Sequence, residues 1–350
     1  MDACSVLIVG GGPAGAACAW QLRRSGLGAD IGADPGASID VVILDRAKFP
    51  RNKVCGGWIT LPVFDELGID PTEYARANVL QPITGFRTCM IGNRETETDY
   101  RKPISYGIRR SEFDDYLLKR SNARLIEGTP LSSVERIGDE WLVNGEIKTQ
   151  LIVGAGGHFC PVARFMGSKS TAESAVAAQE TEFEMTPEQR NKCSIRPEIP
   201  ELYFCSDMRG YGWCFRKGNF INIGLGRLDK HSLGAHIAQF IEFLRRTGKI
   251  TFDLHSKLFG HAYLLYGKSN RRSTRQIPPR KPRAVPPATH QSLRLTPRRL
   301  VNQHRPPPPP ARHQLPRPRP PSHKMVLPPR RPQQLVPAHN RTRLHNSITP

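Results

Sequence analysis

The stretch VLIVGGGPAGAACAWQL at residues 6–22 decides the fold. Residues 5–9 (SVLIV) are short, apolar and β-branched, which predicts a buried parallel strand. Glycines follow, and the sequence then predicts a helix over 13–24. The next apolar run, IDVVILD, predicts a second strand that ends at Asp45. This order indicates a right-handed β–α–β unit in a parallel sheet, and therefore an α/β fold.

The glycines of this stretch have the spacing G-x-G-x-x-G of dinucleotide-binding loops. Gly10 permits the tight turn, Gly12 lets the backbone approach a diphosphate, and Gly15 allows the helix to pack closely on the strand. Pro13 and Ala14 begin the helix, whose N-terminus presents the positive end of its dipole to the diphosphate. We therefore expect these five residues to bind a dinucleotide cofactor.

The acidic residue Asp45 stands where a dinucleotide-binding unit accepts hydrogen bonds from the adenosine ribose. It follows Gly15 by about 30 residues rather than the usual ~20, and a loop rich in Gly, Ala and Asp at 27–38 accounts for the excess. The acid argues against an NADP site, although Arg46, which we also expect to contact the cofactor, directly follows it. The alternative is a glycine-rich turn in some other α/β protein, but the flanking strand, helix and acid favour the cofactor site.

Four further segments have clear patterns. An amphipathic segment at 111–121 predicts a helix, and the segment 148–157 repeats the pattern of an apolar strand that runs into glycines. The region 175–229 is rich in strand-forming residues, and the apolar spacing of 231–248 predicts an amphipathic helix.

The eight cysteines form no C-x-x-C pair, so the sequence gives no sign of a structural zinc site, and we expect no bound metal. Reduced thiols in a cytoplasmic protein are the simplest interpretation. The N-terminus has no signal-peptide pattern, and no apolar run reaches the roughly 18 residues that a membrane span needs.

Residues 271–350 form a tail of distinct composition, with 16 Arg, 2 Lys, 20 Pro and no Gly, Asp, Glu or aromatic residue. Such a segment buries too little apolar surface to offset its ordering entropy, so we expect disorder, with polyproline II character around 306–310. The tail supplies most of the net charge of +20, so the near-neutral body predicts no specific nucleic-acid partner. Two interpretations fit the composition of the tail, a basic interaction arm and an out-of-frame translation. Pro, Arg, His, Gln and Leu dominate the tail, and all have codons that begin with C, which favours the out-of-frame translation.

Three motifs follow the glycine loop in order: KVCGG at 53–57, RSEFD at 110–114 and YGWCFRKG at 211–218. The four motifs together resemble the geranylgeranyl reductase family of FAD-dependent oxidoreductases, which shares the p-hydroxybenzoate hydroxylase-like fold. The resemblance covers most of residues 1–226.

The resemblance implies positions for several residues. It places Cys55, Gly56 and Gly57 near the flavin ring, and Arg110 beside the cofactor. Tyr211 and Trp213 alternate along an expected strand in the substrate domain. They either line an apolar substrate pocket or form ordinary sheet core.

The chain also departs from the family pattern. Where the family has G-A-D-G, this sequence reads GAGG at 154–157, so the Asp is missing at Gly156. Gly154 and Gly156 are still expected to let the backbone approach the cofactor. No Gly follows Gly267, so the family's G-D-A-A-G-type segment is absent and the tail begins where that segment is expected.

The resemblance implies a Rossmann-like, three-layer FAD-binding domain, made of residues 1–50 and 100–168. It is interleaved with a mainly β substrate domain of residues 51–99 and 169–268. The implied reaction is hydride transfer from reduced FAD to a C=C bond of an apolar, isoprenoid-type substrate. NAD(P)H or another electron donor would reduce the flavin, and peripheral membrane contact would give access to the substrate. No side chain stands out as catalytic.

Three alternatives remain open from the sequence. The first is a monooxygenase or halogenase on the same fold. The second is an inactive remnant that does not retain FAD, and the third is nucleic-acid binding through the basic tail.

Overall fold

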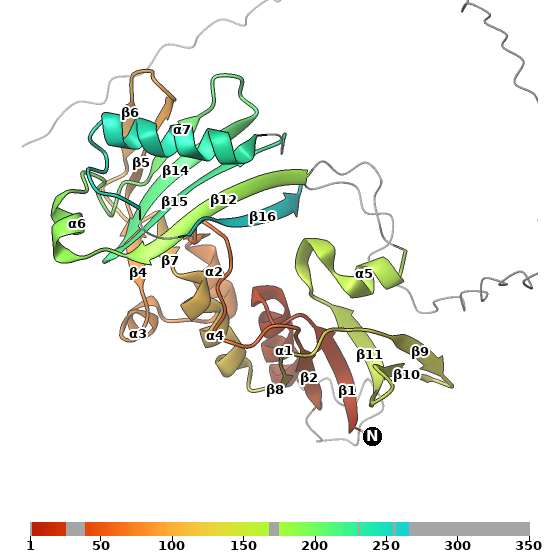
Figure 1. Ribbon diagram of the computed structural model, residues 1–350. Helices are drawn as coiled ribbons and strands as arrows, with labels where there is room; N and C mark the ends of the chain where they lie inside the picture. The colour runs from red at the N-terminus through yellow and green to blue at the C-terminus, as the bar shows by residue number, and fades with distance from the viewer. Residues whose placement is uncertain (1, 26–38, 168–174, 230–231, 255–256, 266–350) are drawn as a thin grey trace, which may run out of the picture. The chain divides into compact units, whose positions relative to one another are not determined.

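The computed structural model describes five stretches of the chain (Figure 1), namely residues 2–25, 39–167, 175–229, 232–254 and 257–265. The disordered tail expected at 271–350 and the enlarged loop expected at 27–38 lie outside the described residues. Within them, no helix is both long enough and apolar enough to cross a membrane.

The first sheet has six strands in the order β8-β2-β1-β11-β10-β9. Their bounds are Arg124–Ile126 (β8), Val41–Leu44 (β2), Asp2–Val9 (β1), Ile147–Gly154 (β11), Glu140–Val143 (β10) and Val134–Ile137 (β9). The first four strands run parallel, and Val9 of β1 pairs with Leu44 on one side and Gly154 on the other. The carboxyl ends of β2, β1 and β11 therefore meet at one edge of the sheet, as the sequence predicts for a β–α–β unit.

Helix α1 (Pro13–Arg24) packs against this sheet, and helix α4 (Arg110–Ser121) packs on α1. Ala16 and Ala19 are fully buried on α1, and their small side chains let the helix lie close to Val6 and Ile8 of β1. The predicted helix over 13–24 is confirmed. The short helices α2 (Pro62–Leu67) and α3 (Pro71–Ala75) complete this core with buried Phe64 and Tyr74.

The second sheet has seven strands in the order β16-β12-β15-β14-β13-β5-β6. Their bounds are Phe259–Leu264 (β16), Ala175–Glu184 (β12), Phe220–Arg227 (β15), Gly210–Lys217 (β14), Glu201–Phe204 (β13), Gly85–Met90 (β5) and Thr96–Asp99 (β6). Helix α7 (Leu233–Arg246) lies across one face of this sheet (Figure 1) and buries Ile237, Phe240 and Leu244 against it. The amphipathic helix expected within 231–248 is confirmed as α7, and its apolar stripe packs on the sheet.

A third sheet of three strands contains β3 (Trp58–Thr60), β7 (Ser105–Ile108) and β4 (Leu80–Ile83). The mixed α/β fold is thus confirmed. The domain boundaries stay a prediction. Each strand lies in a sheet with other strands of its predicted domain, except β7. This strand belongs to the range 100–168 but pairs with β3 and β4, which belong to the range 51–99. The remaining short helices are η2 (Gly157–Phe159), α5 (Pro161–Phe165) and α6 (Pro187–Asn191).

We expect Phe240→Ala to destabilise the fold by about 3–5 kcal/mol, because the ring is buried between α7 and the sheet and truncation leaves a cavity. Phe159→Ala is the matched control: this ring is 53% exposed, so its loss should change stability by no more than about 0.5 kcal/mol. Urea denaturation followed by circular dichroism measures both. Equal effects of the two variants would contradict the proposed role of α7.

Candidate functional site

The two glycine loops meet at the carboxyl edge of the first sheet. Gly10 has φ +118°, and a Cβ there would lie 2.7 Å from the amide nitrogen of Gly156. A Cβ at Gly15 would collide with the carbonyl oxygen of Gly10. Both positions therefore require glycine, and the structure brings together the loop residues that the sequence predicts to approach a diphosphate.

The N-terminus of α1 is open toward a basic side chain. Gly12 is the N-cap residue, Pro13 follows at the first helical position, and none of the described side chains caps the helix. A Cβ built on Gly12 would meet only the Nη2 atom of Arg51, at 3.5 Å. Uncapped helix amides beside a guanidinium group make a site for an anion. Arg51 could not be predicted from the sequence, because it belongs to no motif and reaches the loop only in the folded chain.

Asp45 fixes the glycine loop from the end of β2. Its Oδ2 accepts a hydrogen bond from the Gly11 amide at 2.6 Å, and its Oδ1 accepts one from the Ala47 amide at 2.7 Å. Arg46 beside it is exposed. The structure thus places Asp45 at the expected edge, and its contact with the ribose stays a prediction.

The second glycine loop packs tightly on the start of α5. A Cβ at Gly156 would lie 3.0 Å from Cδ of Pro161 and 3.1 Å from Cα of Cys160. A Cβ at Gly154 would lie 2.8 Å from Cβ of Val162. This close packing gives a local reason for Gly156 where the family pattern has Asp.

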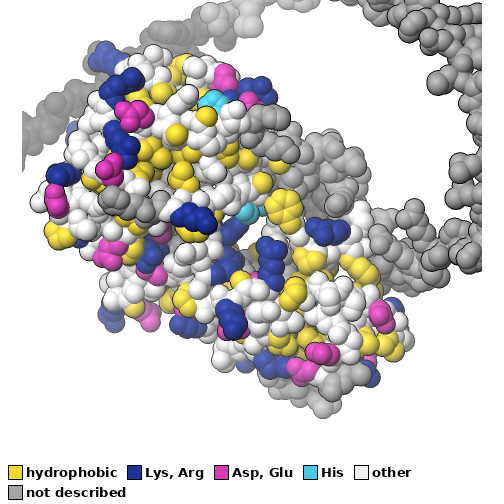
Figure 2. Space-filling view, viewed as in Figure 1, with side chains coloured by type: hydrophobic (Ala, Val, Ile, Leu, Met, Phe, Trp, Pro, Cys, Tyr) yellow, Lys and Arg dark blue, Asp and Glu magenta, His cyan; other side chains and the backbone are white. Residues whose placement is uncertain are grey.

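A basic cluster lies beyond the glycine edge. Arg110, the first residue of α4, donates to Asp114 from Nε at 2.8 Å and from Nη2 at 3.0 Å, and Nη2 of Arg51 lies 3.3 Å from the same carboxylate. Lys53 Nζ lies 2.8 Å from Nε2 of His261. Figure 2 shows basic side chains gathered in the hollow in the middle of the visible face. Three cations beside one buried carboxylate leave an excess of positive charge.

Burial and this charge shift the pKa values of the cluster. Burial lowers the pKa of Lys53, and the nearby cations Arg110 and Arg51 lower it further. Burial, together with Lys53, lowers the pKa of His261 to about 4, so this histidine is neutral at neutral pH. A bound anion would relieve the repulsion between these groups. Sequence patterns gave no partner for His261, because its contact with Lys53 spans most of the chain.

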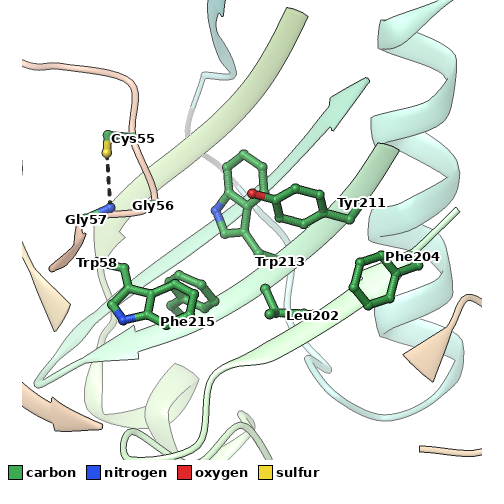
Figure 3. A pocket seen from close by; sticks show the side chains of 9 residues that line it. All are labelled: Cys55, Gly56, Gly57, Trp58, Leu202, Phe204, Tyr211, Trp213 and Phe215. Carbon is green, nitrogen blue, oxygen red and sulfur yellow. Dashed lines mark hydrogen bonds between the residues drawn. The ribbon is translucent and has the colours of Figure 1, made fainter. Parts of the chain in front are cut away.

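An aromatic pocket of about 260 Å³ opens beside the loop Cys55–Gly57. Tyr211, Trp213 and Phe215 project from β14 on one side of it, with the Tyr211 and Trp213 ring centroids 5.9 Å apart (Figure 3). Its other lining residues are Trp58, Leu202 and Phe204. The structure therefore brings the predicted Cys55, Gly56, Gly57, Tyr211 and Trp213 together around one apolar cavity. Their binding roles stay predictions.

A buried polar network that no sequence pattern predicts adjoins the pocket. Trp213 Nε1 donates to Oδ1 of Asn222 at 2.7 Å. Asn222 Nδ2 donates to Glu182 at 3.1 Å, and Lys217, only 1% exposed, forms an ion pair with the same carboxylate. Glu180 lies next to it on β12, with 5% of its surface exposed. Alternation in the run AVAAQETEFE predicts a strand but does not show which carboxylates the neighbouring strands bury.

Sequence comparison finds relatives that are named as reductases, and no family model matches the chain. A digeranylgeranylglycerophospholipid reductase from Methanocaldococcus jannaschii is 26% identical over 255 residues, which cover 69% of this chain and 60% of that protein. A menaquinone reductase from Mycobacterium tuberculosis is 29% identical over 262 residues, which cover 68% of this chain and 58% of that protein. The chain thus spans 58–60% of the length of these relatives.

Solved structures share the fold. A geranylgeranyl bacteriochlorophyll reductase-like protein from Thermoplasma acidophilum superposes with a TM-score of 0.59 at 18% identity, over 75% of this chain and 66% of that chain. A mutant of the halogenase PltM in complex with FAD superposes with a TM-score of 0.56 at 16% identity, over 73% of this chain and 59% of that chain. The chain is thus similar in sequence to reductases of the kind that its motifs resemble, and it shares the fold of a geranylgeranyl bacteriochlorophyll reductase-like protein and of a halogenase.

Proposed function

We propose that this chain binds FAD and reduces a C=C bond of an apolar, isoprenoid-type substrate. The observation that carries the proposal is the course of residues 51–57. This short segment begins with Arg51 at the N-terminus of α1 and ends with Cys55–Gly57 at the aromatic pocket. One continuous stretch therefore links an anion site to an apolar cavity, as an extended dinucleotide with a flat ring system requires.

The residues present fit FAD. The uncapped amides of α1 and the guanidinium of Arg51 suit a diphosphate, and Asp45 suits the adenosine ribose. The cations Lys53 and Arg110 continue the positive charge toward the pocket. Gly156 offers only its backbone, so we expect one polar contact fewer than in the family pattern.

Bound reduced FAD would supply the hydride equivalent, and the chain supplies binding, orientation and exclusion of water. The walls of the pocket are aromatic and aliphatic, so an apolar chain gains about 25 cal/mol for each Å² that it buries there. The two relatives are named for a digeranylgeranyl phospholipid and for menaquinone, both of which carry apolar chains. This supports an apolar substrate for the present chain.

We also propose a setting for the reaction. NAD(P)H or another electron donor would regenerate the reduced flavin, and contact with a membrane surface would give access to the apolar substrate. The eight cysteines are all unpaired, which supports a location in the reducing cytoplasm.

Halogenation or oxygenation on the same fold is the second candidate, favoured by the structural likeness to flavin-dependent halogenases. These reactions consume oxygen, whereas hydride transfer to a C=C bond does not. Dependence on oxygen therefore separates the two candidates.

We expect the purified chain to bind FAD and, when reduced with dithionite without oxygen, to saturate a double bond of geranylgeranyl phospholipid or menaquinone. Flavin absorbance measures binding, and mass spectrometry detects the gain of two hydrogens. Product that forms only with oxygen and carries added oxygen or halogen would favour the second candidate. A sample that stays colourless after reconstitution would refute the proposed cofactor.

We expect Gly15→Ala to destabilise the chain by about 1–3 kcal/mol and to abolish FAD binding, because its Cβ would push α1 away from Gly10. Gly234→Ala is the matched control. Its Cβ would lie in open space on α7, so the change should stabilise the chain by about 0.5–1 kcal/mol and leave FAD binding unchanged. Thermal melts and fluorescence titration with FAD measure both effects. Wild-type FAD affinity in the Gly15 variant would contradict the proposed binding edge.

A further inference from the structure

One face of the seven-stranded sheet has an apolar part and a polar part. In the strand register, Trp213 pairs with Gly224, which pairs with Glu180. One step along, Phe215 pairs with Asn222, which pairs with Glu182. Paired residues share a face, so the aromatic pocket wall on β14 lies beside the carboxylates of β12.

The polar part of this face holds the backbone of the loop Cys55–Gly57. The Cys55 amide donates to Oε1 of Glu180 at 2.5 Å, and Asn222 Nδ2 donates to the Cys55 carbonyl at 3.3 Å. Lys217 Nζ donates to the Gly56 carbonyl at 3.2 Å and to that of Ile108 at 3.0 Å. Three buried side chains thus bind consecutive polar groups of the loop. The segment 51–57 belongs to no strand or helix, so these bonds take the place of a sheet ladder.

The same contacts set how the loop meets the pocket. A Cβ on Gly56 would lie 3.2 Å from Cε2 of Phe215 and 3.7 Å from Nε1 of Trp213. The Trp213 indole lies across Gly224, where any Cβ would collide with it, and is fixed by Asn222. The loop and the aromatic wall are therefore positioned by one network.

We propose that Glu180 is a positioning residue that fixes the loop Cys55–Gly57 against the aromatic pocket. Among the three side chains that hold the loop, Glu180 is the one that accepts from its backbone. The inference concerns the site of the proposed function, yet it rests on contacts within the chain and can be tested without flavin.

The surroundings of Glu180 make this contact sensitive to pH. Its Oε2 is buried and has no hydrogen-bond partner among the described residues. Burial raises the pKa of Glu180 from its ordinary value of 4.5 to about 7, and the Glu182 charge adds to the rise, against the opposing effects of the Cys55 amide, Lys217 and Asn222. His261 of β16 pairs with Ala178, two residues before Glu180 on β12, and it contacts Lys53 of the loop segment.

The direction in which pH changes the stability of the loop follows from proton binding. The closed loop holds the Glu180 proton more tightly than an open loop that exposes the carboxyl group to water. The stability that this gives is fully present below pH 4.5 and is lost as the pH rises through about 7. The loop should therefore open more often as the pH rises toward neutrality.

The test is hydrogen–deuterium exchange of the peptide 53–57 in the flavin-free chain, corrected for the intrinsic pH dependence of exchange. We expect the protection of this peptide to fall by about tenfold between pH 6 and pH 8 in the wild type, from the shift in proton affinity alone. Glu180→Gln keeps the acceptor oxygen but cannot ionise, so its protection should be independent of pH. Glu180→Leu removes the acceptor and should lose protection at every pH.

Glu184→Gln is the matched control, because Glu184 ends the same strand and is exposed, and it should behave as the wild type. Protection that is independent of pH in the wild type, or that falls equally in Glu180→Gln, would overturn the proposal. FAD titration of the same samples separates the two claims. Absent FAD binding with the expected exchange pattern refutes only the proposed cofactor, whereas normal binding with flat exchange refutes only the role of Glu180.

Discussion

The close approach of α1 to the carboxyl edge of the parallel sheet is the constraint on which the site depends. The carbonyl of Gly10 occupies the space where a side chain at Gly15 would lie. This contact brings the helix N-terminus over the ends of β1 and β11, and Asp45 holds the connecting loop through the Gly11 amide. With the uncapped amides fixed there, a diphosphate would meet preorganised donors.

From that edge, the segment 51–57 extends the site to the second sheet. Its beginning contributes Arg51 to the helix N-terminus, and its end is bound by buried side chains of β12, β14 and β15. The polar groups beneath the loop are costly to bury alone, but each of Lys217, Asn222 and Glu182 has partners within the network. One oxygen of Glu180 has no hydrogen-bond partner among the described residues, so Glu180 is the member of the network that we expect to respond to pH.

The parts of the fold and site that depend on local sequence could be predicted. The spacing of Gly10, Gly12 and Gly15, the apolar run before them and Asp45 after the next strand report backbone requirements within one β–α–β unit. The apolar stripe of α7 is likewise local, since helical periodicity alone shows which side is buried. The motifs around Cys55 and Trp213 added the expectation that distant segments meet, and the structure brings them to one pocket.

The remaining site residues depend on strand register and long-range contacts that no pattern reveals. Glu180 alternates with neighbours of similar polarity on β12, and only its pairing with Gly224 directs it toward Trp213 and the loop. Arg51 and His261 acquire their roles through contacts with Gly12 and Lys53, far away in the chain. The close packing around Gly156 likewise arises only in the fold, where the start of α5 lies against the loop that contains Gly156.

The most direct test of this binding site is a crystal structure of the chain grown with FAD. We expect density for the diphosphate at the Gly12 amide and Arg51, with the ring system against Cys55–Gly57 beside Trp213. Ordered FAD bound elsewhere on the chain, or with its ring system away from this loop, would contradict this expectation.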